Sequence, residues 1–340
     1  MKVLLIKTSS LGDVFHTLPA VEDAYRAIPG LQIDWVVEEA FAAIPAWHPA
    51  VNKVIPVAWR RWRKNLFKRE NREELKAFRQ SLRATEYDLV LDAQGLIKSA
   101  VFTRMAKGPR YGLDKNSCRE PLAARAYQFP QAVAKGQHAI PRVRQLFAQA
   151  LGYQVPGDYL SYGVDRTRWT RPQVEGDYWV FLHGTTWITK LWPEAYWQEL
   201  AQKVTANGQT VFLPWGNDEE HERAQRIAAN INGAEVLPKM GLNDLNAYLA
   251  YAQAVVGVDT GLSHVVAALE VPSIAIYGAT DATLTGVLGP QVEVLASQYS
   301  DCAPCLSKTC LKNEPGDIQP PCYREVSPQR VFDSLLSRIG

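Results

Sequence analysis

Short runs of branched apolar residues alternate along the chain with longer stretches in which apolar residues repeat at helical spacing. In the N-terminal part, the runs typical of buried strands are Lys2–Ile6, Asp34–Val37, Lys53–Pro56 and Asp88–Asp92. Helical periodicity appears between them, at Leu18–Ala27 and Arg72–Leu82. Strands that alternate with helices predict an α/β fold with a parallel sheet covered on both faces.

The same pattern repeats in the C-terminal part. Strand-like runs occur at Tyr178–His183, Thr210–Pro214, Glu235–Leu237, Ala254–Val258 and Ser273–Tyr277. Helical stretches lie between them, at Pro193–Ala206, Glu219–Asn230, Leu242–Tyr251 and Ser263–Leu269. The chain is therefore expected to contain two successive domains of the same architecture.

The domain boundary is predicted from a polar segment punctuated by Pro and Gly, about Val155 to Gly176. We expect an N-terminal domain over residues 1–160 and a C-terminal domain over 177–326. The tail, 327–340, begins with Ser-Pro, a good cap and first-turn pair. Its apolar residues form one helical stripe, which predicts a helix that docks back on the body: Val331, Phe332, Leu335, Leu336 and Ile339.

Composition narrows the class of protein. The 340 residues are 47% hydrophobic and 21% charged, as in a globular protein, and a net charge of +2 does not favour nucleic acid as the main partner. No apolar run reaches the length of a membrane span, and the N-terminus reads as a strand rather than a signal peptide. We therefore expect a cytoplasmic protein.

Four of the five cysteines are crowded near the C-terminus, at Cys302, Cys305, Cys310 and Cys322. The first pair has C-x-x-C spacing, which is compatible with a structural zinc site of four thiolates. The later intervals fit no common zinc finger well. An ordered loop without metal is the favoured interpretation, and no catalytic role for a thiol is expected.

Two C-terminal segments have the character of phosphate-binding loops. Gly257–Leu269 leaves a strand and opens a helix, so the backbone amides of Thr260, Gly261, Leu262 and Ser263 should lie at a helix N-terminus, where an anion is favoured. The alternative is that Asp259 or Thr260 only caps the helix and that His264 is an ordinary first-turn residue.

His183–Pro193 also leaves a strand and contains Thr185, Thr186 and Lys190. Such a lysine can neutralise a leaving phosphate, although a lone loop lysine is more often a solvated charge. The P-loop pattern GxxxxGK[ST], the GxGxxG fingerprint and a D-x-D pair are all absent, which disfavours kinases, dehydrogenases and a diphosphate held by chelated metal.

Asp13 follows the first strand in the stretch SSLGDVFHTLPAV, and open α/β sheets place their chemistry at this point. The carboxylate is a candidate general base, and the competing interpretation is that it caps the helix that begins near Val14.

The chain resembles glycosyltransferase family nine, the bacterial heptosyltransferases. The resemblance runs through KTSSLGDVFHTLPA, DWVVEEAFAAIPAWHP, VIPVAWRRWRK, DAQGLIKSA, REPLA, GTTWITKLWPEAYW, LPWG, VLPKM and VDTGLSH. It implies a GT-B fold, with two Rossmann-like domains that face each other across a cleft and the donor held by the C-terminal one. It also implies that heptose is transferred from ADP-L-glycero-β-D-manno-heptose to the first Kdo of Kdo2-lipid A, with inversion and without a required cofactor.

The resemblance further implies roles for single residues. Asp13 corresponds to the family's proposed base, and Lys190 with the Thr260–Ser263 amides would stabilise departing ADP, while Asp259 and His264 would position the sugar or its phosphate. Donor contacts are implied at Thr185, Thr186, Trp215, Glu220 and Met240. Acceptor contacts are implied at Ser10, Gly12, Gln94, Lys98, Arg119, His138 and Arg142.

The stretch Ala58–Arg69 combines bases with aromatic residues: Arg60, Arg61, Arg63 and Lys64 lie among Trp59, Trp62 and Phe67. Clustered bases suit the carboxylates of Kdo and the phosphates of lipid A, and tryptophans favour a membrane interface. We therefore expect a peripheral protein at the cytoplasmic face of the inner membrane. The alternative is a charged helix face in solvent.

Other functions remain open at this level. A nucleotide-sugar hydrolase or epimerase on the same fold, or a binding protein without turnover, would share the donor loops. The motifs GLIKSA and VDTGLSH favour transfer of the first core heptose over the second by resemblance alone.

Overall fold

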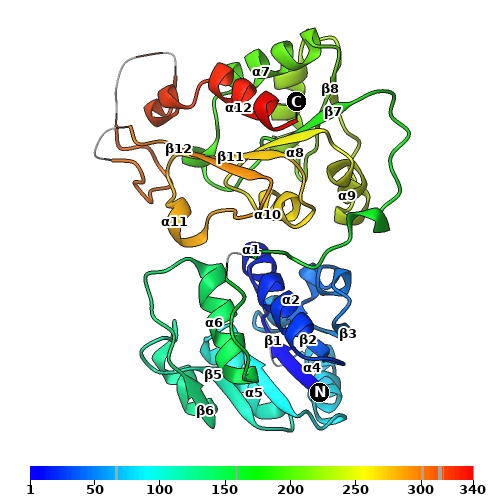
Figure 1. Ribbon diagram of the computed structural model, residues 1–340, viewed down its shortest axis with the longest axis vertical. Coiled ribbons are helices and arrows are strands. Elements are labelled where there is room, and N and C mark those ends of the chain that lie inside the picture. The colour runs from blue at the N-terminus through cyan, green and yellow to red at the C-terminus, as the bar shows by residue number, and fades with distance from the viewer. Residues whose placement is uncertain (66–67, 158, 300–301, 313–315, 317, 340) are drawn as a thin grey trace. The chain divides into compact units, whose positions relative to one another are not determined.

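The computed structural model describes residues 1–65, 68–157, 159–299, 302–312, 316 and 318–339. The chain divides into two compact units, Met1–Asp165 and Arg166–Gly340 (Figure 1). The division falls inside the polar segment in which a linker is expected. Each unit is built from alternating strands and helices.

In the described residues of the first unit, six parallel strands form one sheet in the order β3-β2-β1-β4-β5-β6. The strands are β1 Lys2–Ile6, β2 Gln32–Glu38, β3 Val51–Val57, β4 Leu89–Asp92, β5 Arg110–Leu113 and β6 Phe129–Gln131. The helices are α1 Leu11–Phe15, α2 Leu18–Ala27, α3 Trp59–Trp62, α4 Arg69–Arg83, α5 Ile97–Met105 and α6 Ala139–Leu151. Short 3₁₀ turns are η1 Glu39–Phe41, η2 Pro45–Trp47 and η3 Pro121–Ala126.

The second unit repeats this topology. Its described residues form six parallel strands in the order β12-β11-β10-β7-β8-β9. The strands are β7 Tyr178–Leu182, β8 Thr210–Leu213, β9 Ala234–Val236, β10 Ala254–Val258, β11 Ser273–Tyr277 and β12 Val292–Ala296. The helices are α7 Glu194–Ala206, α8 Asp218–Ala228, α9 Leu242–Ala250, α10 Gly261–Ala268, α11 Ala282–Thr285 and α12 Pro328–Ile339, and the 3₁₀ turns are η4 Arg166–Arg168, η5 Ile188–Lys190 and η6 Pro321–Glu325.

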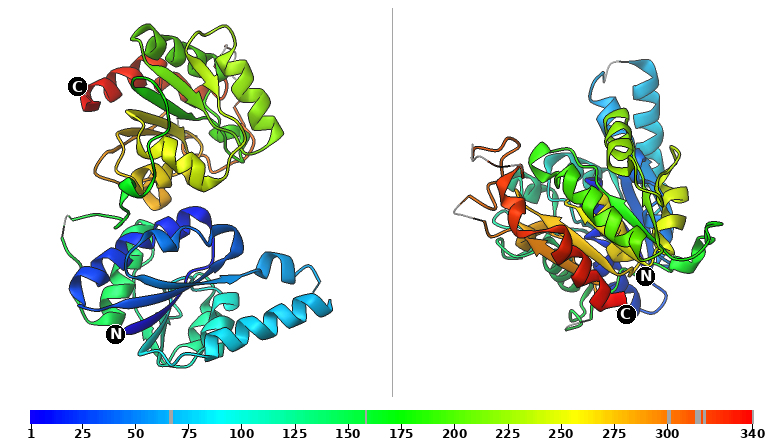
Figure 2. Two further views of the ribbon diagram at one scale, coloured as in Figure 1. Left: turned by 90° about the vertical axis from the view of Figure 1, so that its right-hand side faces the viewer. Right: turned by 90° about the horizontal axis from the view of Figure 1, so that it is seen from above.

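Helices cover both faces of each sheet, as the views in Figure 2 show for the first unit with α2 and α6 on one face and α4 on the other. In that unit, Leu4 and Ile6 of β1 pack with Phe78 of α4 and Phe102 of α5. On the opposite face, Arg144 of α6 donates to Asp23 of α2 at 2.6 Å. A fully buried central strand needs apolar residues on both faces, which explains the unbroken apolar runs.

The tail packs on the second unit as a helix. Val331, Phe332 and Leu335 of α12 are buried, and the ring of Phe332 lies 5.9 Å from that of Trp179 in β7. The indole of Trp192 donates to the carbonyl of Val326 at 2.9 Å, which fixes the segment that precedes α12.

The structure confirms some predicted elements and adds others that the sequence patterns did not predict. The bounds of β1, α2, β10 and β11 match the predicted runs residue for residue. Strands β5, β6 and β12 and helices α5 and α6 were not predicted, since the strands are short and β6 is a mostly exposed edge that contains Pro130. Among the described residues, no helix is long and apolar enough to cross a membrane.

Candidate functional site

Each sheet has a point at its centre where the strand order reverses, and open α/β sheets bind ligands beside the carboxyl ends of the strands there. In the second unit this point lies between β7 and β10. The loops that follow these two strands are His183–Pro193 and Asp259–Thr260, the two loops that the sequence indicates for phosphate binding.

The structure brings the two loops into contact. The Lys190 ammonium lies 2.7 Å from Oδ2 of Asp259, and both side chains are largely buried. The hydroxyl of Thr280, after β11, donates to the same carboxylate oxygen at 2.6 Å, and the Thr185 hydroxyl donates to the Asp259 carbonyl at 2.9 Å. Lys190 also lies over the Trp187 ring, 4.7 Å from its centre. Lys190 is therefore a positioned cation at this point rather than a solvated loop charge.

The N-terminus of α10 meets the same place. Thr260 is its N-cap residue in an extended conformation, and no side chain caps this helix in the described structure. The Asp259 carboxylate bonds to Lys190 and Thr280 instead, so capping is not its role. Ser263 turns inward, donating to the carbonyl of Val258 at 2.8 Å. The first turn of α10 and the Lys190 ammonium thus lie at the same edge of the sheet, an arrangement suited to an anion.

Glycines allow this close packing. A Cβ at Gly257 would lie 2.6 Å from the Ser263 hydroxyl, and a Cβ at Gly184 would lie 2.7 Å from the Glu220 carboxyl group. Glu220 accepts from the Gly216 amide at 2.8 Å, so it links the loops after β7 and β8. His264 is buried in the first turn of α10.

The remaining expected donor contacts lie farther along the carboxyl edge. The Trp215 indole donates to the Leu237 carbonyl at 2.7 Å and stacks on His221 with ring centres 4.1 Å apart. Met240 is half-buried and Thr186 is exposed. Trp215 and Met240 thus follow the adjacent strands β8 and β9.

In the first unit the strand order reverses between β1 and β4, and Asp13 follows β1. Asp13 is the third residue of α1, not the cap residue, which is Ser10. Its Oδ2 accepts from the Ser10 amide at 2.7 Å and from the Ser10 hydroxyl at 3.1 Å. Its other oxygen lies 3.7 Å from the Lys7 ammonium, and about a third of the side chain (36%) is exposed. Asp13 therefore both stabilises the helix start and presents a carboxylate to solvent.

The loop after β4 contacts the loop that precedes Asp13. The Gln94 side-chain oxygen accepts from the amides of Thr8 and Ser9 at 3.0 and 3.2 Å. The Lys98 ammonium donates to the Ser9 hydroxyl at 3.1 Å, and burial lowers its pKa. Gly12 lies in α1 beside Asp13. Ser10, Asp13, Gln94 and Lys98 are thus gathered around one loop.

Other expected acceptor residues have structural bonds. His138 caps α6, where its Nδ1 accepts from the Ile140 amide at 3.1 Å. Arg142 donates to the carbonyls of Ala134 and Ser117 at 3.1 and 2.9 Å, and burial lowers its pKa. Arg119 is exposed, next to Glu120, whose amide bonds to the Gly95 carbonyl.

The interpretation of the basic stretch as a tryptophan-rich membrane surface is wrong for Trp62. This side chain is 3% exposed, packs on Phe78 with ring centres 5.7 Å apart, and donates to Glu74 at 2.7 Å. Arg61 pairs with Glu39 and Glu74. Arg60, Arg63 and Lys64 are exposed, and Phe67 lies outside the described residues. The stretch contributes exposed bases, but its second tryptophan belongs to the core.

Comparison with known proteins establishes the family. The model of glycosyltransferase family 9 (heptosyltransferase) matches residues 75–314. The chain belongs to this family. It is 53% identical to lipopolysaccharide heptosyltransferase 1 of Pseudomonas aeruginosa, over 100% of this chain and 98% of the relative. It is 52% identical to lipopolysaccharide heptosyltransferase 1 of Escherichia coli K12, over 85% of this chain and 91% of the relative.

A solved structure of a family 9 member shows the same fold. E. coli heptosyltransferase WaaC, described with ADP-2-deoxy-2-fluoro heptose, aligns with a TM-score of 0.85 at 44% identity and covers 99% of each chain. The predicted GT-B fold class is confirmed, and the chain is a glycosyltransferase.

Some residues of this candidate site were not singled out from the sequence. Lys7 is buried, and its ammonium donates to the Ala93 carbonyl at 3.0 Å as well as facing Asp13. Its position at the end of an apolar strand was the available signal. Thr280 could not be found in this way because its role depends on β11 lying beside β10.

His183 also escaped notice. It lies fully buried at the end of β7, and burial lowers its pKa to about 4, with a further contribution from Arg223. A neutral imidazole therefore stands at the first position of the loop that carries Lys190.

Proposed function

We propose that this glycosyltransferase transfers L-glycero-D-manno-heptose from ADP-heptose to the first Kdo of Kdo2-lipid A, with inversion at the anomeric carbon. The names of the relatives and the ADP-sugar analogue of the solved neighbour support this donor and acceptor. The observation that carries the proposal is the uncapped N-terminus of α10 beside Lys190, at the reversal point of the second sheet. We therefore propose that the C-terminal unit binds the donor and the N-terminal unit the acceptor.

The leaving group is a diphosphate, so the donor half-site must stabilise negative charge that grows as the bond to the sugar breaks. Lys190 would exchange its contact with Asp259 for a phosphate oxygen, and the amides of Gly261 and Leu262 would bind the others. The Ser263 amide already donates to the Thr260 carbonyl at 3.2 Å and would add only the field of the helix start. Asp259, then held by Thr280 alone, would accept a hydroxyl of the heptose. His264 lies one residue farther along α10. This arrangement supplies the charge that a dissociable metal ion supplies elsewhere.

The remaining donor contacts follow from the same geometry. The ribose and adenine would extend over Trp215, Glu220 and Met240, which follow the next strands of the sheet. Thr185 and Thr186 would contact the phosphates from the β7 loop.

In the first unit, Asp13 is the proposed base. The acceptor hydroxyl attacks the anomeric carbon as the carbon–oxygen bond to ADP breaks, and its proton passes to a carboxylate oxygen of Asp13. The two bonds from Ser10 hold one oxygen, and the other oxygen, which lies 3.7 Å from the Lys7 ammonium, would take the proton.

The acceptor carries carboxylates and phosphates, which need cations. Lys98 donates to Ser9 in the loop before Asp13, and Arg119, Arg60, Arg63 and Lys64 are exposed. We propose that these residues bind the Kdo and lipid A groups with the protein held peripherally at the cytoplasmic face of the inner membrane. His138 and Arg142 would act by fixing the α6 segment.

The test is ADP release by the full chain from ADP-L-glycero-β-D-manno-heptose, with and without Kdo2-lipid A and with EDTA in both reactions. Release that requires the acceptor supports the transferase. Release without acceptor identifies a hydrolase. No release in either reaction, with metal restored as a control, leaves a binding protein or another donor and overturns the proposal.

A further inference from the structure

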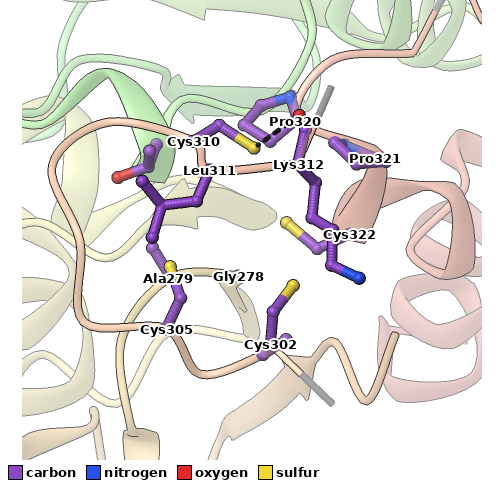
Figure 3. Close-up of a pocket in the computed structure, with 12 residues that line it drawn as sticks. Gly278, Ala279, Cys302, Cys305, Cys310, Leu311, Lys312, Pro320, Pro321 and Cys322 are labelled. Atoms are coloured by element: carbon purple, nitrogen blue, oxygen red, sulfur yellow. Dashed lines mark hydrogen bonds between the residues drawn. The ribbon is translucent and has the colours of Figure 1, made fainter. Parts of the chain in front are cut away.

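A pocket beside the donor half-site is surrounded by cysteines. It has a volume of about 100 Å³ and is lined by Cys302, Cys305, Cys310 and Cys322, together with Thr189, Gly278, Ala279 and Lys312 among others. Figure 3 shows sulfur atoms of Cys302 and Cys322 pointing into this space. All of the chain's cysteines lie in the described residues, and no disulfide joins any of them.

The fold brings these four side chains to one pocket, where the Cys310 thiol donates to the Lys312 carbonyl at 3.5 Å. Cys302, Cys305 and Cys310 lie on the segment after β12, while Cys322 lies in η6 and is 9% exposed. Sequence spacing could not show that all four border one pocket. Only the fifth cysteine, Cys118, lies elsewhere: in the first unit, buried, with its thiol donating to the Leu113 carbonyl.

Four thiols around one small space have a chemical consequence. Several thiolates would repel one another here unless a cation lay between them. A soft divalent metal ion is the usual partner of such a set, with metal–sulfur distances of about 2.3 Å for zinc.

We propose that Cys302, Cys305, Cys310 and Cys322 bind one thiolate-coordinated divalent metal ion, with Zn²⁺ as the first candidate. In the described part of the chain, no three His, Cys, Asp or Glu side chains are already set as metal ligands. Binding therefore requires the four thiol groups to come closer together than they lie in this structure, as metal sites commonly assemble their ligands on binding. Lys312 lines the pocket and would offset the net negative charge of a four-thiolate complex.

A metal ion at this site would stabilise the loop His183–Pro193, which is called the donor loop below because it carries Lys190. The Thr189 hydroxyl, next to Lys190, donates to the carbonyl of Ser307 at 2.6 Å, and Ser307 lies between Cys305 and Cys310. The Tyr323 hydroxyl, next to Cys322, donates to the Thr189 carbonyl at 3.1 Å. Both sides of the pocket thus hold the backbone that presents Lys190. The metal has a structural role, and this consequence for the donor loop rests on the proposed function.

The direct test is the metal content of the purified full chain. We expect one zinc per chain, retained after brief EDTA treatment and released when a mercurial reagent caps the thiols. Refolding in Co²⁺ should give the visible absorption bands of tetrahedral cobalt with a sulfur-to-metal charge-transfer band. A chain that contains no metal, gains no such band and shows four reactive thiols overturns the proposal, as do disulfides among the four cysteines.

Two variants and one control keep the test decisive. Cys305→Ser changes an exposed side chain and should fold, yet lose the metal or hold it at least 10-fold more weakly, as the removal of one ligand implies. Cys322→Ser should do the same. Cys118→Ser should keep the metal and the cobalt spectrum. Equal metal content in all three variants contradicts the proposed ligands.

The donor loop gives a separate readout. If the metal braces Thr189, then Cys305→Ser should raise the KM for ADP-heptose more than it lowers kcat. Metal content is measured without turnover, so an inactive chain that binds zinc would overturn the proposed function alone, and an active chain without zinc would overturn the metal site alone.

Discussion

The two sheets share one topology, but different chemical groups are presented at the points where their strand order reverses. In the first unit, side chains of the protein already occupy the backbone amides: Gln94 accepts from Thr8 and Ser9, and Asp13 accepts from Ser10. In the second unit, no side chain caps the described helix α10, and its carboxylate Asp259 turns to Lys190. One point presents a carboxylate and the other presents uncapped amides with a cation.

This difference shows how one fold can be used twice. A reversal point with uncapped amides favours a diphosphate, whereas one whose loop amides already donate to Gln94 and Asp13 leaves a carboxylate for proton transfer. Fold alone does not assign the two roles. The partners of a few amides do.

The largest expected effect comes from removing the carboxylate of the first unit. Asp13→Asn keeps an oxygen for the Ser10 amide, so α1 should remain folded, but the proton acceptor is lost. We expect heptose transfer to fall by about 10²–10⁴-fold. Steady-state ADP release with Kdo2-lipid A measures this, and ADP affinity by calorimetry should be unchanged. Transfer at the wild-type rate would remove Asp13 from the role of base.

Lys190→Ala removes the cation of the second unit. The loss of one positioned donor at a developing charge predicts a decrease in kcat of about 10²–10³-fold. In contrast to Asp13→Asn, ADP binding should also weaken, because the phosphates lose a charged partner. The same two assays check this. An unchanged ADP affinity would mean that Lys190 serves only to hold Asp259.

Trp62→Ala separates core from surface in the first unit. Because Trp62 is buried and bonded to Glu74, truncation should cost about 3–5 kcal/mol of unfolding free energy. Urea unfolding measures it, with the exposed Arg63→Ala as the matched control, expected to change stability little. If Trp62→Ala were as stable as Arg63→Ala but failed to bind anionic vesicles, the tryptophan would be an interface residue after all.

The smallest expected effect is a change in the pH dependence of stability, and it comes from His183 at the start of the donor loop. Its pKa is lowered to about 4 in the folded chain from 6.5, so the unfolded chain binds more protons between these values. Stability should therefore decrease as the pH falls from 6.5 towards 4, by about 2 kcal/mol at pH 5 from this residue. In His183→Gln, the urea concentrations at the midpoint of unfolding should differ less between pH 7 and pH 5 than they do in the wild-type chain. An equal pH dependence in both proteins would show that His183 is not the titrating group.

The sequence patterns were informative where a strand is central and apolar. They predicted the bounds of β1, β10 and β11 because these strands are buried on both faces. Helix α6 was missed although Ile140, Val143 and Phe147 repeat at helical spacing, so its signal was present. The exposed β6 had no such signal.

Single residues of the candidate site could be predicted from their positions after strands, but the contacts between them could not. Lys190 and Asp259 were each found at a strand end, but their contact depends on β7 and β10 being neighbours, which sequence order does not reveal. Trp62 lies among bases that predicted exposure, yet its ring faces Phe78. The direction of a single side chain in a charged stretch depends on tertiary packing and not on its neighbours along the chain.

The division of roles between the two reversal points is tested most directly by amide chemical shifts of the isotope-labelled full chain during titration with ADP. The account predicts the largest shifts at Gly261, Leu262 and Ser263, and in the loop that contains Lys190. The largest shifts at Thr8, Ser9 and Ser10, with the α10 amides unmoved, would contradict it.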